Sequence, residues 1–131
     1  MTLVDSSAWI EYFRRTESSV DLKLDELLKE EAELVTTEPV LMELLAGARD
    51  PAEETVVRRT LATCRVVMVE GPRDWERAAA IYVAGRRQGR IIRGHIDCLI
   101  AAVAIRAGVP LLAGDRDYEA IAELTPLHLA A

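Results

Sequence analysis

The chain has 131 residues, of which half are apolar and 29% are charged, and its formal net charge is −6. This length suits one domain, residues 1–131, with a full hydrophobic core, and the low aromatic content of 5% predicts that the core is aliphatic. The acidic balance excludes a protein held on nucleic acid by bulk charge alone, but it is compatible with a nucleic-acid enzyme whose acidic site binds cations.

Short apolar segments alternate with helical patterns along the chain. In order, the pattern predicts a strand at 2–4, helices at 8–14 and 18–31, a strand at 34–36, helices at 38–47 and 50–63, a strand at 65–69, a helix at 73–87, a basic loop, a helix at 96–107, a strand at 110–113, a helix at 116–124 and an edge strand at 127–129. Such alternation is typical of an α/β fold with a mainly parallel sheet.

Two local features of the helices follow from the same pattern. A serine, Ser6 or Ser7, is predicted to cap the first helix, because serine hydroxyls accept hydrogen bonds from free backbone N–H groups. In the helix at 73–87, the apolar side is predicted to contain Trp75, Ala78 and Tyr82.

The expected location of the protein depends on signal-peptide, membrane-spanning and cysteine patterns in the sequence. The N-terminus has no basic segment followed by a long apolar one, as a signal peptide would, and no apolar run reaches the length of a membrane span. Cys64 and Cys98 form no C-x-x-C pair and are predicted to be buried, reduced thiols. We therefore expect a cytoplasmic protein without membrane contact.

Four acidic residues stand apart from the others by their position. Asp5 and Asp115 directly follow predicted strands, at the edge where parallel sheets bind ligands. Glu43 lies beside the apolar face of its helix, and Asp97 opens a helix that is apolar almost all round. Each alone has an ordinary explanation, as a helix cap, a boundary side chain or a first-turn acid. Asp117 is placed to cap the last helix or to join the site.

Together, the four acids predict a cation site. Carboxylates gathered at one edge repel each other, and Mg²⁺ or Mn²⁺ with oxygen ligands relieves that repulsion. The small residues Ala101 and Ala104 are expected to leave space beside Asp97 for the ions. Zinc is a poor fit, because the only histidines are His95 and His128 and no Cys/His cluster exists. An all-carboxylate site without a nucleophile–base pair favours phosphodiester hydrolysis by metal-activated water.

Arginines and hydroxyls surround the acids in the sequence. Arg86, Arg87, Arg90 and Arg93 occur without an intervening acid just before Asp97 and, with Arg116, are predicted to hold RNA or DNA phosphates. An ordinary helix end with a favourable dipole explains the first two arginines equally well. The accessory hydroxyls are predicted at Ser6, Ser7, Thr36 and Thr37.

Four segments of the chain resemble a known family: VDSSAWIEYFR, TTEPVLMELLAG, HIDCLIAAVAIRAG and LLAGDRDYEAIA. They are similar, in order and spacing, to the PIN-domain ribonucleases and, within these, to the VapC toxins of bacterial toxin–antitoxin pairs. The resemblance implies a three-layer α/β/α PIN fold with four to five short strands, and a catalytic, metal-binding quartet of Asp5, Glu43, Asp97 and Asp115. Asp117 is a further candidate ligand.

The resemblance also implies an activity and partners. It implies a Mg²⁺- or Mn²⁺-dependent endoribonuclease toxin that cleaves RNA such as tRNA, forms a homodimer and is silenced by a cognate VapB-like antitoxin. In place of the hydroxyl or His-Arg that the family often carries before the fourth acid, this chain has Ala113-Gly114, which leaves the partner groups of Asp115 open.

Two other classes of protein compete with this interpretation. A catalytically weak PIN-like scaffold would act mainly as a protein-binding module, although the complete set of four acids argues against a degenerate site. A metal phosphatase or phospho-receiver domain also places acids at strand ends. Receivers need a paired acid beside the first strand and a late lysine, whereas here Asp5 stands alone and the last lysine is Lys29.

Overall fold

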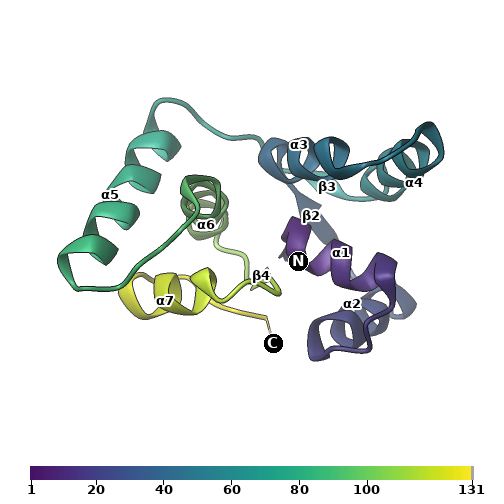
Figure 1. Cartoon of the computed structure of the whole chain (residues 1–131), viewed down its shortest axis with the longest axis horizontal. Coiled ribbons are helices and arrows are strands. Elements are labelled where there is room, and N and C mark those ends of the chain that lie inside the picture. Colours follow the sequence, from purple (N-terminus) through teal and green to yellow (C-terminus); the bar gives the residue numbers. More distant parts are fainter. Residues whose placement is uncertain (131) are drawn as a thin grey trace.

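The computed structural model describes residues 1–130 and has an α/β architecture with four strands in its sheet. Strands and helices follow one another as β1 (Thr2–Val4), α1 (Ser6–Arg14), α2 (Ser19–Lys29), β2 (Leu34–Thr36), α3 (Glu38–Gly47), α4 (Pro51–Leu61), β3 (Arg65–Val66), α5 (Arg73–Arg87), α6 (His95–Ala107), β4 (Leu111–Leu112) and α7 (Asp117–Leu124). Figure 1 shows α5, α6 and α7 on the left, α1 and α2 on the right, and β3 beside α3 and α4 at the top.

The sheet is parallel throughout and has the strand order β3-β2-β1-β4. Strand β1 is therefore central: Leu3 pairs with Val35 on one side and with Leu111 on the other. The chain moves outward from β1 to β2 and β3, and then returns to place β4 on the opposite side of β1. This reversal creates a crevice at the carboxyl ends of β1 and β4, where open α/β sheets bind ligands.

Helix α6 packs deepest in the molecule. Its residues from Cys98 to Ala104 are all buried, so it is apolar around its whole circumference. The helix ends at Gly108, which adopts the left-handed conformation that glycine accommodates without a steric penalty. Because α6 is fixed on every side, the acid in its first turn, Asp97, has a fixed position relative to the sheet.

A buried ion pair joins the beginning of α5 to the end of α6. Asp74 is 0% exposed and accepts hydrogen bonds from Arg106 Nε at 3.0 and 3.1 Å and from Arg106 Nη2 at 3.0 Å. Arg106 also donates to the Met68 carbonyl oxygen at 2.7 Å and pairs with Glu70. Burial alone would raise the pKa of Asp74, but the bonds from Arg106 and the Glu70 backbone hold it below its ordinary value.

Most predicted elements are confirmed, and the differences lie at their ends. The α/β class and the parallel sheet are as predicted, as is the helix at 73–87. Strand β3 is shorter than the predicted 65–69, and the predicted edge strand at 127–129 is only a bridge between Leu111 and Leu129. Both cysteines are buried and free, as predicted. Among the described residues, none of the helices has the length and apolarity that a membrane span requires.

Two predictions about helix faces and caps are wrong. The side chain that caps α1 is Asp5, whose Oδ2 accepts from the Ser7 N–H at 3.0 Å, and not a serine. Ala78 is buried as predicted, but Trp75 is 56% exposed, and the buried side of α5 includes Asp74 and Ile81 instead. Asp74, the residue before Trp75, is the one held inward, by its hydrogen bonds with Arg106.

Candidate active site

Asp5 follows β1 and is nearly enclosed, with 2% of its surface exposed. Its Oδ2 accepts from both the backbone N–H and the hydroxyl of Ser7, and its Oδ1 accepts from the Tyr118 hydroxyl at 2.8 Å. Burial raises the pKa of Asp5 above its ordinary value, although these hydrogen bonds oppose the shift. Asp5 thus caps α1 and also belongs to the acidic group, so its role as a helix cap and its role as a site acid are compatible.

Glu43 reaches the same crevice from α3. Its Oε1 accepts a hydrogen bond from the Ser6 hydroxyl at 2.9 Å, which links α3 to the start of α1. Partial burial raises the pKa of Glu43, and the charges of Asp5 and Asp115 raise it further. The boundary side chain predicted from the sequence therefore turns toward the acids.

Asp97 lies at the centre of the acidic group. Its Oδ1 lies 3.3 Å from the Tyr118 hydroxyl oxygen, whose single hydrogen it shares with the closer Asp5 Oδ1 at 2.8 Å. Burial raises the pKa of Asp97 to about 7, and the charges of Asp5, Asp115, Glu43 and Asp117 add to the shift. At neutral pH this carboxyl group is only partly ionised without a cation, which is the electrostatic signature of a site that needs positive charge.

Asp115 and Asp117 follow β4 and differ in what holds them. Asp115 is exposed, and its Oδ1 accepts from the Asp117 N–H at 2.9 Å at the start of α7. Asp117 is buried, and its Oδ2 accepts from the backbone N–H groups of Arg93 and Gly94 at 2.9 and 3.3 Å. Asp117 therefore anchors the loop before α6, while Asp115 keeps more free oxygen surface.

The acids border an open pocket of about 530 Å³ lined by Glu43, Arg93, Gly94, His95, Ile96, Asp97, Asp115 and Asp117. Ligand oxygens of Asp97, Asp115 and Asp117 all lie within 4.8 Å of one another. The prediction that Ala101 and Ala104 leave space beside Asp97 is wrong: both are fully buried in the core and neither lines this pocket. The space comes instead from the loops after β4 and before α6.

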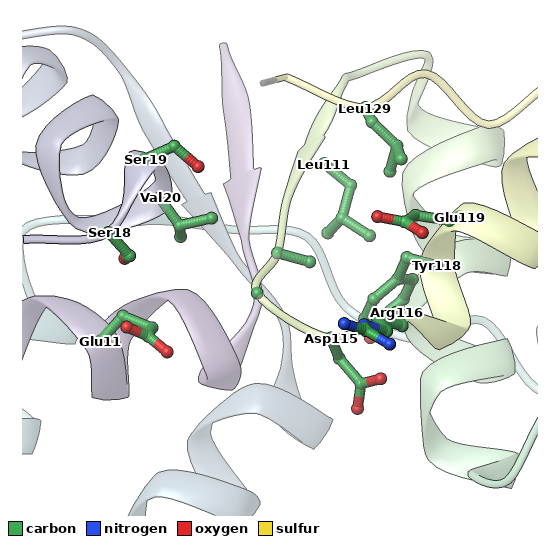
Figure 2. A pocket seen from close by; sticks show the side chains of 12 residues that line it. Glu11, Ser18, Ser19, Val20, Leu111, Asp115, Arg116, Tyr118, Glu119 and Leu129 are labelled. Carbon is green, nitrogen blue, oxygen red and sulfur yellow. The ribbon is translucent and has the colours of Figure 1, made fainter. Parts of the chain in front are cut away.

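A second pocket of about 340 Å³ is lined by Asp115 as well, together with residues of α7, Glu11 of α1 and the start of α2. Figure 2 shows Glu11 and Ser18 on one wall and Arg116 and Glu119 on the other, with Asp115 at the border. Asp115 lines both pockets, so the two pockets adjoin at this residue.

The five predicted RNA-binding arginines do not form one group. Arg86 and Arg87 lie in the last turn of α5 and are exposed. This position agrees with the alternative that they are ordinary cations at a helix end, favoured by the helix dipole. Arg90 pairs with Glu123 of α7. Arg93 lines the acidic pocket, with its Nε 3.8 Å from Asp117 Oδ1, and Arg116 lines the second pocket. Only Arg93 and Arg116 thus directly border the acids.

Of the predicted accessory hydroxyls, those of Ser6 and Ser7 contact acids of the site, whereas those of Thr36 and Thr37 do not. Ser6 and Ser7 contact site acids, and Ser7 Oγ also accepts from the Gly114 N–H at 2.9 Å, so a hydroxyl does reach the loop that carries Asp115. The Thr37 hydroxyl donates to Glu38 instead, at 3.3 Å. Thr36 Oγ1 is buried and has no hydrogen-bond partner within residues 1–130.

Two residues at the site were not identified from the sequence. Tyr118 contacts both Asp5 and Asp97. The sequence feature that could have identified it is a tyrosine, with its polar hydroxyl, at a buried position of α7. His95 lines the acidic pocket and packs edge-on against Tyr82, with 4.5 Å between ring centroids. Burial and the neighbouring acids raise the pKa of Tyr118 well above its ordinary value, so its hydroxyl remains a donor.

These groups fit a hard divalent cation. The donors are carboxylate oxygens from four different parts of the fold, and burial together with the charges of the other acids raises the pKa of Asp97. Arg93 lines the same pocket, and its Nε lies 3.8 Å from Asp117 Oδ1.

Comparison with known proteins identifies the family. Residues 2–124 match the PIN domain family. The chain is 42% identical to the VapC ribonuclease Mb1587 of Mycobacterium bovis and to ribonuclease VapC11 of Mycobacterium tuberculosis, over 100% of this chain and 98% of each relative. The chain belongs to the VapC family of PIN-domain proteins.

Solved structures share the PIN fold. VapBC2 from Rickettsia felis, bound to a DNA fragment from its promoter, has a TM-score of 0.77 at 17% identity and covers 98% of this chain and 96% of its own. VapC20 of Mycobacterium tuberculosis, a sarcin–ricin loop cleaving toxin, has a TM-score of 0.69 at 21% identity, over 98% of this chain and 99% of its own. The three-layer PIN architecture predicted from the sequence is therefore confirmed.

The metal-free PIN domain is expected to lose stability as the pH rises toward neutrality. The pKa of Asp97 is about 7 in the fold and 3.8 as its ordinary value, so between these values the folded protein holds a proton that the unfolded chain has released. The stabilisation is complete below 3.8 and is lost progressively up to about pH 7. Melting temperatures in EDTA should therefore fall from pH 5.5 to pH 8, and added Mn²⁺ should reverse the fall at pH 8. A melting temperature that rises over this range in EDTA would contradict the raised pKa.

Proposed function

We propose that this PIN-domain protein is the toxin of a toxin–antitoxin pair and acts as a divalent-metal-dependent endoribonuclease. One observation carries the proposal: Asp5, Glu43, Asp97 and Asp115, from separate elements, converge at the switch point of the sheet in a chain that is 42% identical to proteins named as VapC ribonucleases. Acids that repel one another in a crevice are costly to stability, and a bound cation is what offsets that cost.

Each acid has a role in this proposal. Asp5 and Asp97 would hold a Mg²⁺ or Mn²⁺ ion, and Asp115 would hold a second ion or its water. Glu43, fixed by Ser6, would orient the attacking water toward the phosphate. A divalent cation at this place supplies the charge that lowers the pKa of the attacking water and offsets the charge of the phosphate. Asp117 stays a loop anchor and a candidate additional ligand.

RNA would enter along the two pockets that adjoin at Asp115. Arg93 lines one pocket and Arg116 the other, and they would bind phosphates that flank the cleaved bond. Arg86, Arg87 and Arg90, further along the same stretch of chain, would extend this positive surface at lower affinity. A tRNA fits such a substrate class, and we place the action of the toxin in the cytoplasm.

The proposed partner is a VapB-like antitoxin, and the proposed assembly includes a homodimer of the toxin. Support comes from solved relatives with the same fold, which include VapBC complexes from Rickettsia felis and Salmonella typhimurium. An antitoxin segment that presents a cation would complement the repelling acids in the same way as a metal ion does.

The proposal is tested by RNA cleavage. The purified protein is incubated with a total RNA pool in Mg²⁺, in Mn²⁺ and in EDTA, in parallel with Asp5→Ala and Asp97→Ala. We expect discrete cleavage products only for the wild type with metal. Equal cleavage by the wild type and both variants would reject the assigned site. If the wild type binds metal and antitoxin but cuts no RNA, the alternative of a PIN-like scaffold that acts as a protein-binding module is favoured.

A further inference from the structure

The hydroxyl of Tyr118 lies against two acids that come from distant parts of the chain. Tyr118 is fully buried in α7, and its Oη is 2.8 Å from Asp5 Oδ1 and 3.3 Å from Asp97 Oδ1. Asp5 follows the central strand and Asp97 opens the central helix. This one hydroxyl group therefore links the sheet to α6 at the acidic crevice.

The hydrogen bonds of Asp5 show which of its oxygen positions the Tyr118 hydroxyl and the Ser7 groups occupy. A carboxylate offers about four acceptor positions, two on each oxygen. In Asp5, Oδ2 is occupied by the N–H and the hydroxyl of Ser7, and one position of Oδ1 is taken by Tyr118. These three bonds leave one position of Oδ1, which is the position that a cation would use. Because Asp5 is enclosed, no second rotamer can offer another oxygen without breaking the bonds to Ser7.

Asp97 is held from the opposite side as well. A Cβ atom at position 94 would lie 2.9 Å from Asp97 Oδ2, so the absence of a side chain at Gly94 lets this carboxylate lie against the loop backbone. Asp97 is thus placed between the Gly94 backbone and the Tyr118 hydroxyl. Mutual repulsion would otherwise favour its rotation toward the open pocket.

We propose that Tyr118 is a positioning residue, whose hydroxyl turns one oxygen of Asp5 and one oxygen of Asp97 toward the same divalent cation. This inference rests on the proposed metal-dependent function of the acids. Groups that hydrogen-bond to metal ligands fix the direction of those ligands, and their removal commonly weakens metal binding by about 10-fold to 100-fold. Tyr118 acts only through the two carboxylates and has no contact with RNA in this proposal.

The test is calorimetric titration of the purified, metal-free protein with Mn²⁺, in the absence of RNA. Tyr118→Phe keeps the buried ring and removes only the hydroxyl, and we expect the Kd for Mn²⁺ to rise about 10-fold. Tyr12→Phe is the matched control, because the Tyr12 hydroxyl makes no hydrogen bond within residues 1–130, and it should leave the Kd unchanged. RNA cleavage by Tyr118→Phe should fall at low Mn²⁺ and recover at saturating Mn²⁺, as weaker binding requires.

Each alternative result has a distinct meaning. A folded Tyr118→Phe protein that binds Mn²⁺ as tightly as the wild type would overturn the positioning role and leave the proposed function intact. A Tyr118→Phe protein that does not fold, judged by circular dichroism, would show that the hydroxyl serves the fold instead. A wild-type protein that binds no Mn²⁺ would overturn the proposed function itself and this inference with it.

Discussion

Replacing Asp97 with asparagine is expected to slow RNA cleavage by about 10³-fold and, at the same time, to raise the melting temperature of the metal-free protein at pH 8. The loss of rate follows because a metal site supplies several kcal/mol of transition-state stabilisation, and about 4 kcal/mol corresponds to this factor. The gain in stability follows because Asn removes the charge at the centre of a group of acids that repel one another.

The opposite signs of the two effects make this prediction specific. Cleavage rates and EDTA melting curves are measured on the same preparations of the wild type and Asp97→Asn. Asp25→Asn is the matched control, because Asp25 lies on α2 and pairs only with the exposed Lys29 within the described chain. It should leave the cleavage rate unchanged. An Asp97→Asn protein that is less stable in EDTA than the wild type would indicate that Asp97 serves the fold.

Replacing Asp74 with asparagine is expected to have the reverse outcome: a loss of about 3 kcal/mol in the free energy of unfolding, with normal cleavage by the molecules that remain folded. Asp74 is fully buried and forms three of its hydrogen-bond contacts with Arg106, so the neutral amide leaves a partly buried guanidinium without its main counter-charge. The change is measured by urea denaturation followed by circular dichroism.

The control for Asp74 is the other acid that pairs with Arg106. Glu70 has 59% of its side chain exposed and lies 3.3 Å from Arg106, so Glu70→Gln should cost less than about 1 kcal/mol, as exposed ion pairs usually do. Equal losses from Asp74→Asn and Glu70→Gln would contradict the view that burial makes the Asp74–Arg106 pair the link between α5 and α6.

Much of the fold was predictable because local chemistry and the final structure agree. The apolar segments at 2–4 and 34–36 are strands with the predicted bounds, since nothing except a buried sheet accommodates such runs between helices. Asp5 and Asp115 were predictable as site candidates because the carboxyl ends of parallel strands meet at one edge. Asp97 was predictable as a site candidate because it is an acid in the first turn of a helix that is otherwise apolar almost all round.

The parts that sequence patterns did not predict depend on contacts between distant residues. Trp75 is exposed, whereas its neighbour Asp74 is buried and paired with Arg106, 32 residues later. The hydroxyl bridge from Tyr118 joins residues 113 positions apart, which no local pattern records. Ala101 and Ala104 were assigned to the site because they are small, yet small residues also allow a central helix to pack closely on all sides, and this second use is the one observed.

The central claim is that Asp5, which follows β1, and Asp97, in the first turn of α6, together bind a divalent cation. The most direct measurement is a crystal structure of the protein soaked in Mn²⁺, with data collected to record the anomalous scattering of manganese. We predict an anomalous peak in the crevice, within coordination distance of Asp97 and of Oδ1 of Asp5. A structure in saturating Mn²⁺ with no peak between these two carboxylates would contradict the assignment of the site.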